Sequence, residues 1–154
     1  MNEQISAAHR KLLNEYLDLS TMTLGTVGQD GQAHVAPVYF VADENIDLYF
    51  FSKPDSQHIQ DLEGNPSAAI SIYPECFDWQ EIRGVQMQGS VGSNIPRKKE
   101  KQLIKLYSEK FPFVSGLKIA FTENRMYQFR PEWVRVVDNR VQFGHKTEFS
   151  LAAD

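Results

Sequence analysis

TMTLGTVGQDGQAHVAPVYFVADENIDLYFFS (residues 21–52) contains three runs rich in β-branched and aromatic residues, the types that strands favour. The runs lie at 21–27, 32–41 and 46–52, with short polar turns between them. The first turn, GQDG at 28–31, is a hairpin signal. Because proline has no N–H to donate, Pro37 places the second strand at a sheet edge or interrupts it. The segment therefore predicts an antiparallel meander.

Further helices and strands are expected on both sides of this segment. Helical spacing and cap residues predict helices within 1–20, from about 56 to 62, and over 96–111. Runs of strand-forming residues predict strands at 67–73, 81–91, 119–129, 133–137 and 141–143, with a turn at Asp138-Asn139 between the last two. This order predicts a mainly β fold, a small antiparallel barrel with flanking helices, in one domain spanning 1–154 with no second domain.

Composition argues against several classes of protein. The chain of 154 residues is 42% hydrophobic and 23% charged, which is typical of one globular domain. Its net charge of −4 argues against general nucleic-acid binding through phosphate neutralisation. Cys76 is the only cysteine, so no internal disulfide can form, and residues 1–10 lack the apolar core of a signal peptide. We therefore expect a cytoplasmic protein that binds neither nucleic acid nor membrane.

The sequence contains none of the common catalytic or metal-binding motifs. Its four histidines form neither an HExxH pattern nor a Cys/His cluster, so no metal site is expected. A GxSxG elbow, a Walker A loop and a GxGxxG fingerprint are also missing. The spacing of residues therefore identifies no catalytic acid, base or nucleophile.

One short stretch, SKPDSQH at 52–58, gathers two hydroxyls, a lysine and a histidine where a predicted strand passes into a helix. The first turn of a helix has unpaired N–H groups and the positive end of the helix dipole, which suit a phosphate. A purely structural role is the alternative, with Ser56 as a helix cap and Lys53 as a solvated side chain. The stretch is therefore a candidate anion site.

Four segments resemble the pyridoxamine 5′-phosphate oxidase-like split-barrel family, whose members mostly bind flavin mononucleotide (FMN). They are APVYF at 36–40, LYFFS at 48–52, the pattern SxHxxxLxxNP at 56–66 and WQEIRGVQMQG at 79–89, with a weaker likeness over 128–144. The SxH pair, the IRGVQ strand and the segment FGHK at 143–146 are also similar to a bacterial subgroup of this family.

The resemblance implies a split β-barrel of about 6–8 antiparallel strands, a flavin-dependent oxidoreductase, and a homodimer with the FMN site at its interface. The flavin ring would lie along Pro37, Val38, Tyr39 and Phe51. The phosphate would be held by Ser52, Ser56, Gln57 and His58, with Lys53 beside them. The partner subunit's Arg83 and the partner subunit's Gln86 would close the ring site, and Trp133 would lie near the flavin edge.

Two departures from the family pattern narrow these expectations. Typical members carry lysine or arginine where Gln57 and His58 stand. A neutral imidazole binds phosphate less strongly, so we expect weak FMN binding that strengthens below about pH 6.5. Residues 130–140 match the substrate-binding signature of the true oxidase only loosely, so oxidation of pyridoxamine phosphate is not expected. The resemblance implies no particular small-molecule substrate or electron donor.

Two alternative functions stay open. One is a non-catalytic flavin- or haem-binding protein that serves as a sensor or a store. The other is a split-barrel dimer that has lost its cofactor and serves as a binding module. The lysine- and arginine-rich face of residues 96–110 is most simply a solvated surface.

Overall fold

The three predicted strands of residues 21–52 are present in the computed structural model, which describes residues 5–116 and 123–151. They form β1 (Thr21–Val27), β2 (Ala33–Tyr39) and β4 (Leu48–Ser52), and the short β3 (Val41–Ala42) follows β2. β1 and β2 pair as an antiparallel hairpin from Thr21 opposite Tyr39 to Val27 opposite Ala33. The second predicted run is thus divided into β2, which pairs with β1, and β3, which pairs antiparallel with β4, so both predicted hairpins are present.

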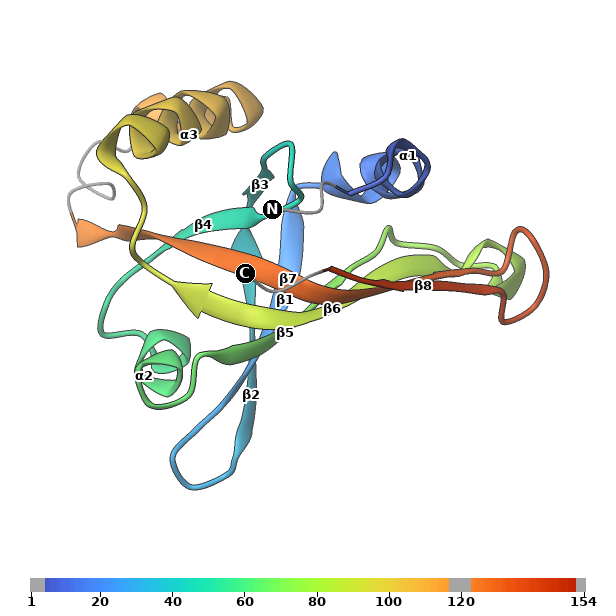
Figure 1. Cartoon of the computed structure of the whole chain (residues 1–154), viewed down its shortest axis with the longest axis horizontal. Coiled ribbons are helices and arrows are strands. Elements are labelled where there is room, and N and C mark those ends of the chain that lie inside the picture. Colours follow the sequence, from blue (N-terminus) through green and yellow to red (C-terminus); the bar gives the residue numbers. More distant parts are fainter. Residues whose placement is uncertain (1–4, 117–122, 152–154) are drawn as a thin grey trace.

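The strands form one antiparallel sheet that curls into a split barrel (Figure 1). The later strands are β5 (Ser67–Ile72), β6 (Arg83–Gly92), β7 (Arg125–Asp138) and β8 (Lys146–Ser150). The spatial order of the strands is β2-β1-β5-β6-β7-β4-β3, and β8 pairs with the C-terminal part of β7. β2 stands at one end of this order, which confirms the edge position that Pro37 predicted.

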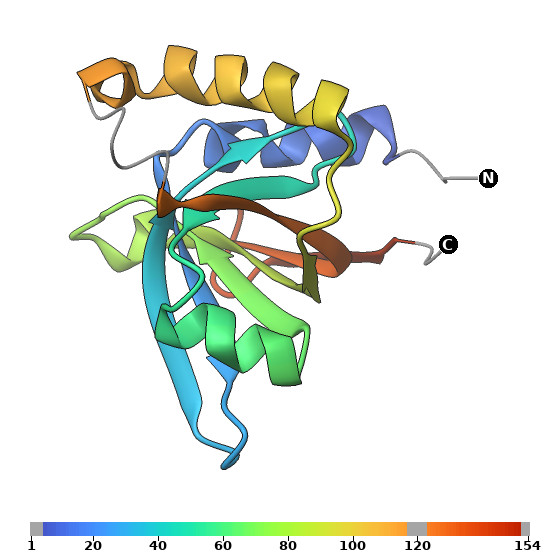
Figure 2. The same cartoon turned by 90° about the vertical axis from the view of Figure 1, so that its left-hand side faces the viewer.

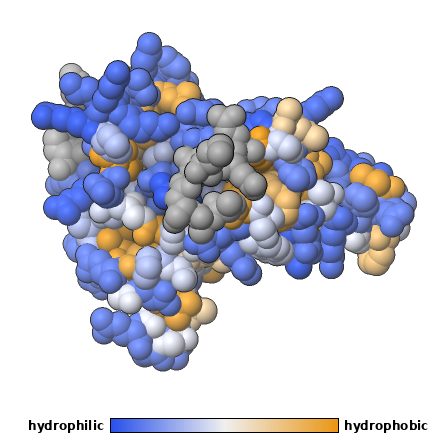
Figure 3. Space-filling view, viewed as in Figure 1, coloured by the Kyte–Doolittle hydropathy of each residue, from blue (hydrophilic) through white to orange (hydrophobic). Residues whose placement is uncertain are grey.

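The three α-helices of the described residues cover the sheet at two ends. α1 (Ala7–Leu17) and α3 (Arg97–Lys110) lie above it in Figure 2, and α2 (Gln57–Gly64) lies below, against β1 and β2. Two 3-10 helices, η1 (Trp79–Glu81) and η2 (Pro112–Gly116), complete the described elements. Figure 3 shows a mostly hydrophilic surface over α3, in agreement with its predicted solvated face. None of the described helices is long and apolar enough to cross a membrane.

Two hydrophobic clusters hold these elements together. The larger fills the barrel, and its fully buried aromatic side chains are those of Tyr16, Phe40, Phe50 and Phe129. The smaller lies under α3 and consists of Val41, Tyr49, Leu103, Tyr107, Phe111, Val114 and Met126. Both contain residues of α1 or α3, so each long helix is attached to the sheet by its apolar face.

The prediction for the C-terminal part of the chain was wrong in two respects. Two strands were expected at 119–129 and 133–137, but a single strand, β7, runs through both segments. Residues 119–122 of the first segment lie outside the described part of the chain. Pro131 does not interrupt β7, because it faces Gly89 at a β-bulge, where the register of the two strands shifts. A bulge tolerates a residue that has no N–H to donate. Residues 141–143 form a turn instead of a strand, and the last strand is β8.

Candidate functional site

The corner between β4 and α2 brings three polar side chains into contact. Ser52 is the last residue of β4, Ser56 occupies the N-cap position of α2, and His58 lies in its first turn. The Ser52 hydroxyl hydrogen-bonds with His58 Nε2, and the Ser56 hydroxyl lies 3.3 Å from the same nitrogen. The Ser56 side chain makes no cap hydrogen bond to an N–H of α2, and its hydroxyl donates to the Lys53 carbonyl at 2.7 Å. Ser56 therefore occupies the position of a helix cap without the side-chain hydrogen bond of one.

The surroundings of His58 favour the neutral form of its imidazole. Burial lowers the pKa of its imidazole below the ordinary value, and the more distant charge of Asp61 only partly opposes this effect. Lys53, the other basic residue of the corner, is 61% exposed, and its Nζ lies 3.6 Å from a carboxylate oxygen of Glu123. At neutral pH the corner therefore offers hydrogen-bonding groups and only a solvated positive charge.

The corner opens into a cavity of about 410 Å³. Eight of the predicted site residues line it: Pro37, Val38, Tyr39, Phe51, Ser52, Lys53, Ser56 and His58. They come from β2, from β4 and from the β4–α2 corner, which are brought together by the curl of the sheet. The cavity thus combines a polar corner with an apolar strand surface.

Four further residues complete the cavity wall and were not predicted: Tyr107, Phe113, Val114 and Asn124. Phe51 and Tyr107 make an edge-on contact with ring centroids 4.9 Å apart, and Tyr39 and Phe113 lie 5.2 Å apart. One signal in the sequence could have pointed to these residues, the aromatic segment Phe111-Pro112-Phe113 at the end of the basic helix. Nothing in the local pattern, however, indicated that this segment folds over β2 and β4.

The arrangement of strands and site can now be compared with known proteins. A sequence model of the family described as pyridoxamine 5′-phosphate oxidase matches residues 5–138. The chain belongs to this family. A UPF0306 protein of Enterobacter sp. (strain 638) is 22% identical over 141 residues, which are 91% of this chain and 95% of that protein.

Solved structures with low sequence identity share the fold of this pyridoxamine 5′-phosphate oxidase family member. A haem-binding protein from Mycobacterium smegmatis aligns with a TM-score of 0.75 and 16% identity, over 96% of this chain and 59% of that one. An F420 reductase aligns with a TM-score of 0.61 and 19% identity, over 79% of this chain and 94% of that one. These likenesses confirm the predicted split-barrel fold.

Gln57 lies apart from the other predicted phosphate-site residues of this family member. Its Nε2 donates to Asp61 Oδ1 at 2.9 Å, and it lines a separate open cavity of about 770 Å³ on another side of α2. Asp61 is buried and also accepts from Thr26 Oγ1 at 2.8 Å and from His34 Nδ1 at 2.7 Å. Burial opposes ionisation of Asp61, but these hydrogen bonds outweigh it and lower the pKa of the carboxyl.

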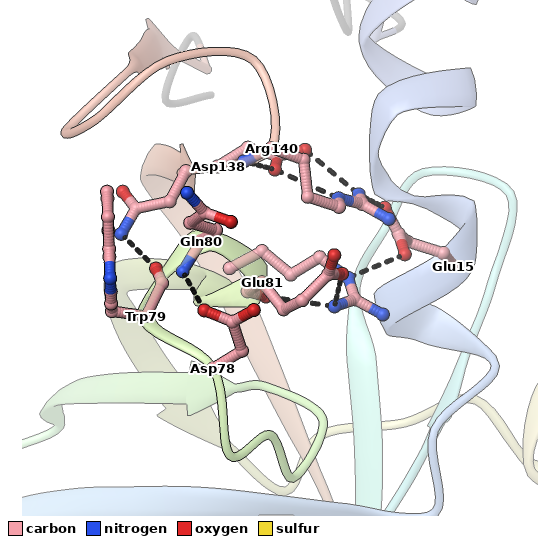
Figure 4. A network of polar contacts seen from close by, with 9 residues as sticks. Glu15, Asp78, Trp79, Gln80, Glu81, Asp138 and Arg140 are labelled. Carbon is pink, nitrogen blue, oxygen red and sulfur yellow. Dashed lines mark hydrogen bonds and ion pairs between the residues drawn. The ribbon is translucent and has the colours of Figure 1, made fainter.

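Arg83 also lies outside the cavity at the β4–α2 corner. Its Nε lies 3.2 Å from Glu15 Oε2, which ties the start of β6 to α1. Arg140 also donates to the Glu15 carboxylate (Figure 4). Its Nε and Nη2 donate to the two carboxylate oxygens of Asp138 at 3.0 and 2.9 Å. This network fixes the turn after β7 against α1, so the contacts that Arg83 makes within the chain are structural.

Gln86 and Trp133 lie on a different surface, the outer face of the sheet. They line an open groove of about 730 Å³ together with small residues of β1 and β5. The Arg135 guanidinium covers the Trp133 ring at 4.7 Å from its centroid. Neither Gln86, predicted to close the ring site from a partner subunit, nor Trp133, predicted near the flavin edge, therefore lines the cavity at the β4–α2 corner.

No group of three or more His, Cys, Asp or Glu side chains within residues 5–116 and 123–151 is placed to hold a metal ion. The lone Cys76 is partly buried in the segment between β5 and η1, away from the residues that line the cavity. The side chains that line the cavity carry hydroxyl, imidazole, amine, amide and aromatic groups.

Proposed function

We propose that this protein binds FMN in the cavity at the β4–α2 corner and acts as a flavin-dependent oxidoreductase. The observation that carries the proposal is the division of one cavity of about 410 Å³ into a polar corner and an aromatic wall. FMN has the same division, with a phosphate at one end and a planar ring at the other. Membership of a family that often binds flavins supports the proposal.

The polar corner has donors suited to a phosphate. The hydroxyls of Ser52 and Ser56 lie 3.5 Å apart and can both turn toward an anion. Because no Ser56 cap occupies the first turn of α2, its N–H groups and the positive end of the helix dipole add to these donors. His58 would contribute a further N–H when protonated. The phosphate would therefore be held by several weak contacts and no buried fixed cation.

The aromatic and apolar residues would hold the ring. Pro37, Val38 and Phe51 present apolar surface to the cavity from β2 and β4. A bound flavin would supply hydride transfer at its ring, and the protein would orient the ring and exclude water from it. No carboxylate lines this cavity among the described residues, so we assign no protein acid or base.

We further propose that the protein is a homodimer whose second copy covers the outer sheet face around Gln86 and Trp133. Members of this family are commonly dimeric. The apolar side chain of Val35 is 75% exposed at this groove. Packing of a second copy there would bury it and carry the partner's Gln86 toward the first copy's FMN site. Light scattering coupled to gel filtration measures the mass directly, and a monomer would refute this part.

Haem is the second candidate ligand, because a haem-binding protein shares the fold. His58 is the only histidine that lines the cavity within the described residues. Its Nε2 contacts the hydroxyls of Ser52 and Ser56, so an iron would have to displace both contacts from that nitrogen. Iron ligation at this nitrogen would therefore cost the hydrogen bond that Ser52 makes to it.

The absorption spectrum tests the proposal. The spectrum of the purified protein is recorded during titration with FMN; bound flavin that bleaches with a nicotinamide donor and recovers in air is the expected result. Bound flavin that no donor reduces would indicate a sensor, a Soret band would indicate haem, and no binding even with excess FMN would indicate a degenerate module. Each of these three results would refute the proposed oxidoreductase.

A double variant tests the location of the site. Ser52→Ala with Ser56→Ala removes both hydroxyls, and we expect loss of FMN binding with the oligomeric state unchanged. Ser67→Ala with Ser93→Ala, two exposed serines outside the cavity, is the matched control. Circular dichroism establishes that both variants fold. Unchanged FMN affinity in the Ser52/Ser56 variant would show that the phosphate binds elsewhere.

A further inference from the structure

Phe113 is held over the cavity by its neighbours in the chain. Phe111 and Val114 are buried in the cluster under α3, and the Val114 N–H donates to the Phe111 carbonyl at 3.0 Å. Phe113 lies between these two anchors and remains 48% exposed. Its ring centroid is 5.9 Å from that of Phe111. The position of Phe113 at the cavity is therefore fixed by core packing of the residues on either side.

Phe113 and Tyr39 form a half-open aromatic pair on the cavity wall. Their rings are tilted by 55°, and Tyr39 is also packed against Phe111 with centroids 5.0 Å apart. Tyr39 is 44% exposed, although it belongs to a strand that lines the cavity. Large aromatic side chains that are held rigidly and left partly uncovered next to a cavity are typical of a ligand-binding surface.

We propose that Phe113, together with Tyr39, forms an aromatic wall that packs against the planar ring of the ligand and makes η2 a specificity element. The wall would select phosphate monoesters that carry a planar apolar ring over inorganic phosphate and over phosphates without a ring. The inference rests on the proposed FMN site and adds to it a residue from a segment distant in sequence. Aromatic packing of this kind changes affinity by about tenfold.

Three probes separate the two parts of the site: FMN carries ring and phosphate, riboflavin carries the ring alone, and inorganic phosphate competes for the corner alone. For Phe113→Ala we expect about tenfold weaker binding of FMN and of riboflavin, with unchanged competition by phosphate. For Ser56→Ala we expect weaker binding of FMN and phosphate and unchanged binding of riboflavin. Flavin fluorescence quenching measures all of these affinities.

Two further variants control the experiment. Phe113→Trp retains a flat aromatic surface and should restore at least wild-type affinity for FMN. Phe77→Ala removes a phenylalanine that is 97% exposed and lies outside the cavity, so it should change no affinity. If Phe113→Ala bound FMN within twofold of the wild-type affinity, the proposed aromatic wall would be overturned and the proposed FMN site would stand. Failure of the wild type to bind FMN would overturn the proposed function, and the inference with it.

Discussion

The Ser52 hydroxyl and His58 Nε2 hydrogen-bond across the corner at which β4 passes into α2. With neutral His58 the hydroxyl donates and Nε2 accepts, which agrees with the lowered pKa of the imidazole. Protonation would turn Nε2 into a second donor and add a positive charge beside the two serines. The candidate phosphate corner is therefore polar at neutral pH and cationic in acid.

This relationship predicts that FMN binding is linked to proton uptake. Burial lowers the pKa of His58 in the free protein, and a bound phosphate would raise it. Because the complex then binds the proton more tightly than the free protein does, affinity should increase as the pH falls through neutrality toward 5.5. His58→Lys should bind FMN about tenfold more tightly at pH 7.5 and lose this pH dependence. Isothermal titration at several pH values checks both effects.

Lys53→Gln provides the control for this prediction, because it removes a positive charge that is exposed and already paired with Glu123. We expect its effect on affinity to be small, about twofold. A wild-type affinity that is equal at pH 7.5 and 5.5 would contradict the role of His58.

The buried carboxylate of Asp61 should be important for stability. It is held by Thr26, His34 and Gln57, and thereby joins α2 to the β1–β2 hairpin. Asp61→Asn replaces an acceptor oxygen by an NH₂ group beside these donors, and we expect Tm to fall by roughly 5 °C. Glu63→Gln makes the same change of charge at an exposed position of α2 and should leave Tm within about 1 °C. Equal Tm values for the two variants would contradict this role.

The titration of Asp61 should also make the stability of the protein depend on pH. The pKa of Asp61 is lower in the folded protein than in the unfolded chain, so its stabilising contribution is complete above the unfolded value and is lost as pH falls through the folded value. The difference in stability between the wild type and Asp61→Asn should therefore shrink in acid. Chemical denaturation from pH 7 down to pH 3 measures this difference, and a constant difference would refute the linkage.

Gly89 should tolerate no side chain. A Cβ at this position would lie 2.0 Å from the Arg130 carbonyl oxygen, because the bulge opposite Pro131 brings the two backbones together. Gly89→Ala should reduce the free energy of unfolding by about 3 kcal/mol. Gly92→Ala is the matched control in the same strand, since a Cβ there would have no neighbour within 4 Å. Denaturant unfolding compares the two, and similar losses would argue against the clash.

Lys110 should make stability depend on pH in the alkaline range. Its Nζ donates to the carbonyls of Leu17 and Phe40 at 3.1 and 3.0 Å, and burial lowers its pKa to about 8. The unfolded chain keeps this proton to about pH 10.4. Because the unfolded state then binds more protons than the native state above pH 8, stability should rise with pH in this interval.

Lys110→Met should remove that rise, whereas Lys105→Met, at an exposed position of the same helix, should retain it. Urea denaturation between pH 7.5 and 9.5 provides the measurement, below the range in which ordinary tyrosines titrate. Identical slopes for the wild type and Lys110→Met would show that another group is responsible.

The sequence by itself determined most of the local structure. The boundaries of β1 follow from its run of β-branched and apolar residues, and the edge position of β2 follows from Pro37, because both depend on chemistry within a few residues. The corner at Ser52, Ser56 and His58 was predictable for the same reason, since a strand end, a helix start and its polar residues adjoin in the chain.

Only the tertiary structure decided which distant groups meet. Phe113 reaches Tyr39 because the buried face of α3 packs on β3 and β4, and Gln57 turns away because the buried charge of Asp61 requires its amide. β7 continues through Pro131 because Gly89 on the neighbouring strand permits a bulge. Such contacts depend on burial and on partners far away in the chain, which the local pattern of residues does not contain.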